Sequence, residues 1–240
     1  MKPLWEQEDF QRVAGEFWRP GGPELTRRAL ELAARHCGLA PGARLLDLGC
    51  GPGASLELLA GLGYRPLGLD RRAHAAWGKR AAGAARIPAV IFLRADAVRP
   101  PLVDNSVDAV LCECVLSLLP DPLDALRGCR RILRPGGALL LSDLFLHGDM
   151  VEEGGVSPLP PESGCPAGAR SRAVWEGLLV RAGFVPHCFE DHSRALVELA
   201  ARLLWYGADA VPERLRGGCA CGGRRGSVGY GLWIAQKEGS

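Results

Sequence analysis

Residues 45–60, with the sequence LLDLGCGPGASLELLA, constrain the fold more than any other part of the chain. An apolar run leads into three closely spaced glycines, and a run rich in leucine and alanine follows them. This pattern predicts a strand, a tight loop and a helix. Glycines in such a loop allow a ligand to lie almost on the backbone, since a Cβ atom there would collide with it. The stretch therefore predicts a ligand-binding loop at the end of a strand.

Apolar strands and amphipathic helices alternate along most of the chain. A helix is expected over 24–37, where apolar residues recur at helical spacing and Gly38 follows. Further helices are expected over 54–62, 72–85, 122–133, 171–184 and 193–206, and strands over 43–49, 65–70, 89–96, 107–113, 136–145, 184–190 and 227–237. The alternation favours an α/β fold, with a doubly wound, mainly parallel sheet and helices on both of its faces.

The composition narrows the classes of partner and the cellular location that we expect for the chain. Its 240 residues suit one main domain with a large apolar core. Lysine and arginine number 29 against 27 acidic residues, so no strong positive field attracts a polyanion, and nucleic acid is not an expected partner. No run approaches the roughly 18 apolar residues of a membrane helix, and the expected location is cytoplasmic. Nine cysteines at scattered spacings indicate free thiols rather than a disulfide framework.

An acidic residue at the end of the next predicted strand narrows the class of ligand. Asp70 follows the glycine loop by about 20 residues, the spacing at which nucleotide-binding α/β folds place an acceptor for ribose hydroxyls. Asp47, within the end of the first strand, would repel a pyrophosphate and would favour an ammonium group. A zwitterionic amino acid joined to adenosine meets these demands, so S-adenosylmethionine is the expected cofactor.

Residues 44–146 resemble the class I S-adenosylmethionine-dependent methyltransferases. The resemblance rests on the segments LLDLGCGPG, GLD, ADA and VDAVLCECVLSLLPDPLDALRGCRRILRPGGALLLSD. It implies a seven-stranded, Rossmann-like sheet whose last strand is antiparallel, with the cofactor at the carboxyl ends of the first strands. The cofactor positions that it implies are Asp47, Gly49 and Gly51 for the methionine part, Asp70 for the ribose, and Asp96 with Ala97 for the adenine.

Further positions complete the expected site. Cys50, Gly53 and Arg71 are expected among the cofactor-binding residues, and Glu113, just after the fourth strand, is expected to face the cofactor or the substrate. The sequence LRPGG at 133–137 is expected to form the turn before the fifth strand. One methyltransferase domain is expected over 1–240. It would have a helical cap over 1–40 and loops above the active site at 147–171 and 216–226.

The late cysteines suggest a class of methyl acceptor. A cysteine in a Gly- and Pro-rich loop, a helix, the sequence AGF and a second late cysteine resemble the arsenite methyltransferases. In that family two late cysteines hold trivalent arsenic, and the matching positions are Cys165 and either Cys219 or Cys221. Trivalent arsenic prefers thiolate ligands and keeps a lone pair that can attack the methyl carbon. The chain departs from the family at Leu56, where a further cysteine would be expected.

Three hypotheses about function remain open on the sequence. The first is methyl transfer to a small, soft acceptor such as trivalent arsenic, held by Cys165 with Cys219 or Cys221. The second is methyl transfer to a small organic acceptor, such as a quinone precursor or a biosynthetic acid. The third is a metal-binding or redox partner protein that only senses the cofactor. A C-x-C pair with one distant cysteine lacks the spacing of a structural zinc site, so no resident metal is expected.

The remaining cysteines are expected to fill the core rather than to react. Cys37 and Cys129 fall on predicted helices beside apolar residues. Cys112 and Cys114 flank Glu113 at the end of a strand, where alternation would place both on the face opposite that glutamate.

Overall fold

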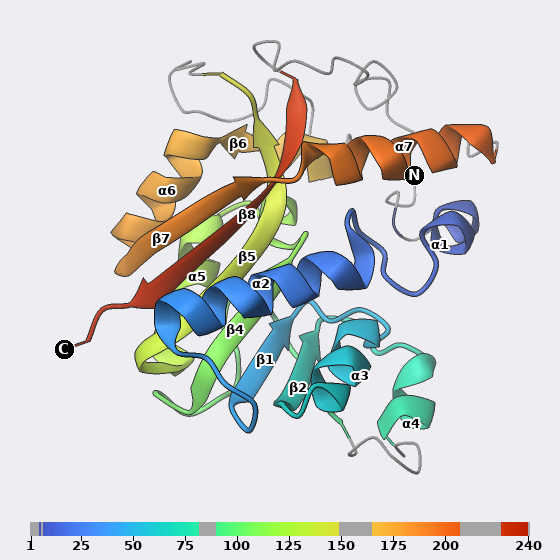
Figure 1. Cartoon of the computed structure of the whole chain (residues 1–240). Helices are drawn as coiled ribbons and strands as arrows, with labels where there is room; N and C mark the ends of the chain where they lie inside the picture. The colour runs from blue at the N-terminus through green and yellow to red at the C-terminus, as the bar shows by residue number, and fades with distance from the viewer. Residues whose placement is uncertain (1–4, 6, 82–89, 149–164, 207–226, 240) are drawn as a thin grey trace.

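The computed structural model describes residues 5, 7–81, 90–148, 165–206 and 227–239 (Figure 1). The helices are α1 (Glu8–Ala14), α2 (Gly22–Cys37), α3 (Ala54–Gly61), α4 (Ala76–Ala81), α5 (Pro122–Ile132), α6 (Arg172–Arg181) and α7 (Ser193–Trp205), with short 3-10 turns η2 (Leu116–Leu118) and η4 (Cys165–Gly168). The strands are β1 (Arg44–Leu48), β2 (Arg65–Asp70), β3 (Ile91–Arg94), β4 (Val107–Glu113), β5 (Leu133–Leu146), β6 (Arg170–Ser171), β7 (Phe184–Asp191) and β8 (Val228–Lys237). None of the described helices is long and apolar enough to cross a membrane.

The strands form one sheet in the order β3-β2-β1-β4-β5-β8-β7, and β6 pairs with the far end of β5. Pairs from β3 to β5 are parallel, whereas β8 runs antiparallel to both β5 and β7. The order reverses between β1 and β4, which is the topological switch point where open α/β sheets bind ligands. The predicted doubly wound sheet with an antiparallel last strand is confirmed.

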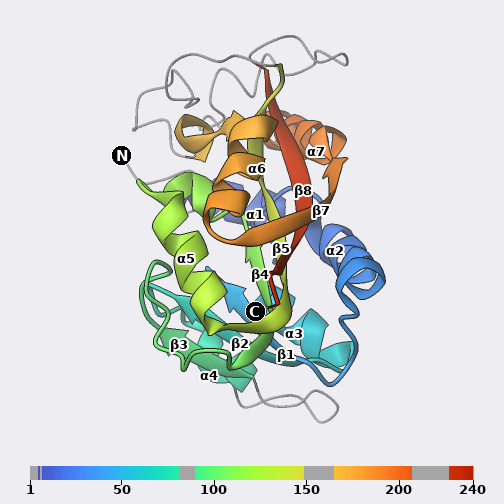
Figure 2. The ribbon, with the colours of Figure 1, turned by 90° about the vertical axis from the view of Figure 1, so that its left-hand side faces the viewer.

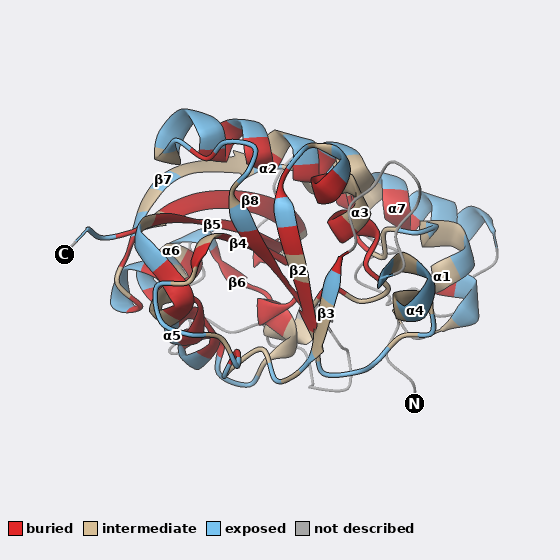
Figure 3. Ribbon diagram, turned by 90° about the horizontal axis from the view of Figure 1, so that it is seen from below, coloured by how far each residue is buried: buried red, intermediate tan, exposed pale blue. Residues whose placement is uncertain are grey.

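Helices cover both faces of the sheet, as the edge-on view of Figure 2 shows. The core on one face includes Leu126 and Trp175 from α5 and α6, and the core on the other includes Leu32 from α2 and Leu59 from α3. Central strands are therefore buried on both sides and the edge strands β3 and β7 are not (Figure 3). This double burial explains why the central strands read as almost continuous apolar runs.

Element boundaries differ from the expectations at several places. Helix α1 was not predicted, and α2 begins at Gly22, before the expected residue 24. The segment 133–137 was expected as a turn but forms the beginning of β5. Its pairing with β4 is irregular between Val107 and Ala109, and Gly136 there has φ +72, so the glycines allow a distorted strand.

Candidate active site

A cavity of about 860 Å³ lies at the carboxyl ends of β1, β2 and β4. The strand ends, the loops that follow them and the segment around α1 all contribute to its wall. Nine of the residues expected at the site line it: Asp47, Gly49, Cys50, Gly51, Asp70, Arg71, Asp96, Ala97 and Glu113. The fold therefore brings together side chains that are distant in sequence. Their contacts with a cofactor remain predictions.

The glycine loop has the geometry that its sequence predicts. Gly49, Gly51 and Gly53 all have positive φ, with values of +76, +50 and +93, in the region that glycine adopts readily. The amides of Gly49 and Cys50 donate to the Leu69 carbonyl at 2.7 and 3.0 Å, which fixes the loop against β2. A Cβ atom built on Gly51 would meet no described atom within 4 Å. The backbone at Gly51 therefore borders open space within the cavity.

Asp70 connects this loop to β2. Its Oδ2 accepts a hydrogen bond from the Gly51 amide at 3.0 Å, and its Oδ1 accepts one from the Arg72 amide at 2.9 Å. Asp96 is held similarly, because its Oδ1 accepts from the Val98 amide at 2.9 Å. Both carboxylates retain free lone pairs, since an ionised carboxylate has about four acceptor sites. Each is thus fixed in position and can still accept a further hydrogen bond.

Cys50 fills space rather than offering a reactive thiol. Its side chain packs where β2 has Gly68, and a Cβ atom at Gly68 would lie 2.7 Å from the Cys50 sulfur. Burial, with a smaller contribution from the negative charges of Asp47 and Asp70, raises the pKa of Cys50 far above the usual range of a thiol. The thiol is therefore protonated at neutral pH.

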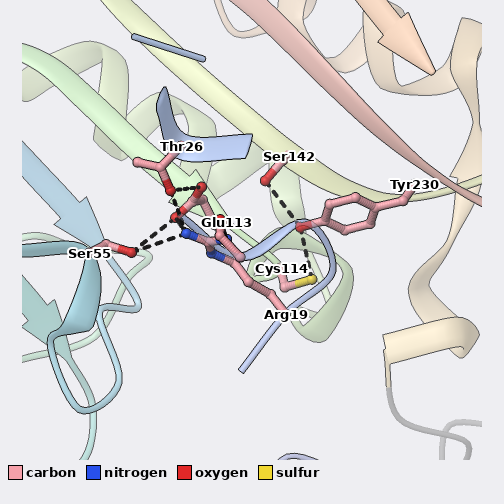
Figure 4. A network of polar contacts seen from close by, with 8 residues as sticks. Arg19, Thr26, Ser55, Glu113, Cys114, Ser142 and Tyr230 are labelled. Atoms are coloured by element: carbon pink, nitrogen blue, oxygen red, sulfur yellow. Dashed lines mark hydrogen bonds and ion pairs between the residues drawn. The ribbon is translucent and has the colours of Figure 1, made fainter. Parts of the chain in front are cut away.

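A buried polar network occupies the floor of the cavity (Figure 4). The Arg19 guanidinium forms an ion pair with Glu113, with 2.7 Å between Nη2 and Oε2. Arg19 Nη2 also donates to Thr26 Oγ1 at 2.5 Å and to Ser55 Oγ at 3.2 Å. Both hydroxyls in turn donate to Glu113, at 3.1 Å from Thr26 and 3.2 Å from Ser55. Three segments from separate parts of the chain thus meet on one carboxylate.

Asp47 lies near this network and is almost fully buried, with 3% of its surface exposed. Burial raises its pKa well above the ordinary range, the nearby Glu113 charge raises it further, and the Arg19 charge opposes the shift. The floor therefore holds two acids and one arginine. The sequence did not single out Arg19, because it stands in a segment, FWRPGG, that carries no recognisable motif.

The position of Cys114 corrects an expectation. Alternation placed this residue on the face opposite Glu113, yet both line the cavity. The strand ends at Glu113, and Cys114 has φ +58, which is rare for a residue with a Cβ atom and reverses the alternation. The Cys114 thiol donates to the Tyr230 hydroxyl at 3.2 Å, and Ser142 Oγ lies 3.1 Å from the same hydroxyl (Figure 4). Cys112 is fully buried as expected.

The remaining cavity wall is mostly apolar. Phe10 of α1 packs with Leu199 and Leu203 of α7, and all three line the cavity. Leu118, Leu119 and Leu144 extend this wall on the side of η2 and β5. The site thus joins a polar floor beside the glycine loop to an apolar chamber.

The predicted roles of Cys165, Cys219 and Cys221 stay predictions, because the structure does not describe their side chains. Cys219 and Cys221 lie outside the described residues, and only the backbone of Cys165 is described, at the start of η4. The η4 turn packs against η2, where a Cβ atom on Gly168 would lie 1.8 Å from the Ser117 carbonyl oxygen. The backbone that carries Cys165 therefore lies near the segment that follows Cys114.

Comparisons with known proteins agree with this geometry. Residues 46–141 match the family model described as a methyltransferase domain. The ubiquinone biosynthesis O-methyltransferase of Xanthomonas campestris is 34% identical over 147 residues, which are 58% of this chain and 60% of that protein. The demethylmenaquinone methyltransferase of Renibacterium salmoninarum is 35% identical over 122 residues, 51% of this chain and 49% of that protein. The chain thus spans about 60% or less of the length of these curated relatives.

The fold is also that of solved methyltransferases. Phosphoethanolamine N-methyltransferase 2 from Haemonchus contortus, solved with S-adenosyl-L-methionine, superimposes with a TM-score of 0.69. The sequences are 19% identical, and the match covers 96% of this chain and 56% of that one. The chain has the Rossmann-like methyltransferase fold, as the resemblance implied. The residues that match the methyltransferase domain model, 46–141, run from β1 into β5 of this fold.

Proposed function

We propose that this chain is an S-adenosylmethionine-dependent methyltransferase that acts on a small acceptor. One observation carries the proposal. A single cavity contains the open backbone at Gly51, the acidic residues Asp47 and Asp70 beside it, and an apolar chamber. In this proposal Asp70 binds the ribose hydroxyls, Asp96 with Ala97 borders the adenine, and Asp47 and Glu113 border the methionine part. When bound, the cofactor supplies an electrophilic methyl group on a sulfonium sulfur.

The ion pair and hydrogen bonds of the acidic residues in the cavity favour an acceptor that needs no deprotonation. Glu113 is held in an ion pair with Arg19, and Asp70 accepts two backbone hydrogen bonds. Asp47 borders the methionine part of the cofactor in this proposal, so it does not face the acceptor. A soft atom with an available lone pair, such as thiol-bound trivalent arsenic, attacks a methyl carbon without proton transfer. Cys114 lines the cavity, and in this proposal its thiol is one ligand of such an acceptor, with Cys165 and Cys219 or Cys221 as the others.

A second candidate acceptor is a phenolic hydroxyl of a quinone precursor. The apolar chamber between α1 and α7 suits an aromatic ring with an apolar substituent. The curated relatives named above act in ubiquinone biosynthesis or on demethylmenaquinone, according to their names. In this alternative the acceptor reaches the cavity already ionised, or loses its proton to solvent or to a basic side chain of the lining such as His74.

The two candidates are separated by one panel of assays. The full chain is supplied with S-adenosylmethionine and with arsenite plus glutathione, selenite plus glutathione, or a soluble catechol, and S-adenosylhomocysteine formation is measured. We expect turnover with arsenite that falls at least tenfold in Cys114→Ser and is unchanged in Cys188→Ser, whose thiol lies outside the cavity lining. Turnover with the catechol alone would instead support the quinone-type acceptor. Absence of turnover with every acceptor would contradict both assignments.

A further inference from the structure

The hydroxyl of Tyr230, a fully buried residue of β8, lies one side chain behind the wall of the cavity. The Cys114 thiol, which lines the cavity, donates to this hydroxyl at 3.2 Å, and Ser142 Oγ lies 3.1 Å from it (Figure 4). The three side chains come from the end of β4, from β5 and from β8, which are neighbours in the sheet. The proposed function uses Cys114 and leaves the two buried hydroxyls without a role.

Backbone hydrogen bonds hold all three residues in place. The Cys114 amide donates to the Ser142 carbonyl at 2.8 Å, so Ser142 fixes the backbone of the cysteine whose thiol Tyr230 contacts. The Tyr230 amide donates to Ser193 Oγ at 3.2 Å, and its carbonyl accepts from the His192 amide at 2.7 Å. Ser193 begins α7, which also forms part of the cavity wall. Tyr230 is therefore fixed both within the sheet and against α7.

The hydrogen bonds among these side chains can run in either direction. A hydroxyl has one hydrogen and two lone pairs, and its hydrogen rotates to suit its neighbours. While Cys114 is a thiol, it donates to Tyr230, which donates to Ser142. When the sulfur has lost its hydrogen, Tyr230 donates to the sulfur and Ser142 donates to Tyr230. No heavy atom has to move for this reversal, and the buried Tyr230 hydroxyl keeps its partners.

A soft acceptor bound by thiols requires this reversal. In the ligand exchange, the bond from arsenic to one glutathione sulfur breaks and a bond from arsenic to the Cys114 sulfur forms. The thiol proton leaves on the released glutathione, and arsenic stays trivalent. The bound sulfur then has lone pairs and no hydrogen. Burial raises the pKa of Tyr230 well above the usual range of a phenol, so its hydroxyl keeps a hydrogen to donate to that sulfur.

We infer that Tyr230 is a positioning residue for a soft methyl acceptor: its hydroxyl, supported by Ser142, holds the Cys114 sulfur at the cavity wall both as a free thiol and as an arsenic ligand. The inference rests on the proposed function in its soft-acceptor form. Neither Tyr230 nor Ser142 lines the cavity, so both act through Cys114. Binding of the cofactor should therefore not depend on the Tyr230 hydroxyl.

The test measures the affinity of the full chain for arsenite in excess glutathione, and for S-adenosylhomocysteine, by calorimetry. Tyr230→Phe removes the hydroxyl and keeps the ring. We expect it to weaken arsenite binding by about three- to tenfold, the range of one ordinary hydrogen bond. Ser142→Ala should weaken it by about twofold or less, because Tyr230 can still donate to the sulfur. The affinity for S-adenosylhomocysteine should stay within about twofold in both variants.

Two controls separate positioning of the thiol from a general effect on the fold. Tyr64→Phe makes the same change at another buried tyrosine of the same core, outside the cavity lining, and should change neither affinity. In a Cys114→Ala background, where the sulfur is absent, Tyr230→Phe should cause no further loss of arsenite binding.

Three results would overturn the inference: an unchanged arsenite affinity in Tyr230→Phe, an equal loss of S-adenosylhomocysteine affinity, or a further loss of arsenite binding in the Cys114→Ala background. Arsenite binding that requires Cys114 but not Tyr230 would thus refute the inference alone. A wild-type chain that binds no arsenite, or a Cys114→Ala variant that binds it as tightly as the wild type, would refute the soft-acceptor function, and the inference with it.

Discussion

Asp47 is singled out by the sequence, and the structure gives it an environment that the sequence does not show. In sequence it is the single acid within an apolar strand end, and its burial could not be read from spacing alone. In the fold it stands on the cavity floor near Glu113, and desolvation raises its pKa well above the ordinary range. Because the folded-state pKa exceeds the unfolded one, the neutral acid stabilises the fold at low pH. That contribution is lost as the pH rises through the folded-state pKa.

Cofactor binding should release a proton from Asp47. The cations of S-adenosylmethionine favour the ionised carboxylate, so the pKa of Asp47 falls in the complex. Affinity should then rise with pH between the pKa of the complex and that of the free protein, and should level off above both. Calorimetry in buffers of different ionisation enthalpy measures the released proton directly. Asp47→Asn should abolish the release, and a wild-type affinity that falls as the pH rises would contradict the prediction.

At the scale of elements, glycines decide where the 3-10 turns beside the cavity can pack. Gly168 of η4 approaches the backbone of η2 so closely that a Cβ atom would lie 1.8 Å from the Ser117 carbonyl oxygen. Gly177, on the exposed face of α6, has no described atom within 4 Å of such a Cβ. Substitution by alanine should therefore lower the free energy of unfolding at Gly168 and raise it at Gly177.

Gly168→Ala should lower the free energy of unfolding by about 1–3 kcal/mol, the usual cost of overpacking. Gly177→Ala should raise it by about 0.5–1 kcal/mol, because glycine is a poor residue inside a helix. Urea denaturation of both variants, followed by far-ultraviolet circular dichroism, gives the two values. Equal and small effects would show that η4 does not pack on η2 as described.

At the scale of the whole molecule, the alternation of strands and helices was sufficient to predict a mainly parallel, doubly wound sheet, and the resemblance to class I methyltransferases implied the carboxyl-end location of the site. The switch between β1 and β4 brings Gly51, Asp70 and Asp96 to one cavity, as expected. Arg19 and Cys114 could not be predicted, because one lies in an irregular segment and the other depends on a positive φ. Helix α1 is short and is defined by its packing on α7, which no local pattern reveals.

The central claim is that the space beside Gly51 holds S-adenosylmethionine. Titration of S-adenosylhomocysteine into the wild-type chain and into Gly51→Val, with circular dichroism to check the fold, tests it most directly. We predict saturable one-to-one binding to the wild type and none to Gly51→Val. A branched side chain would occupy the ligand's space there, and no described atom lies within 4 Å of its Cβ. The φ of +50 at Gly51 strains any residue with a Cβ atom, so the circular dichroism spectrum must show that the variant keeps its fold. Undiminished binding in a folded Gly51→Val variant, or no binding to the wild type, would contradict the claim.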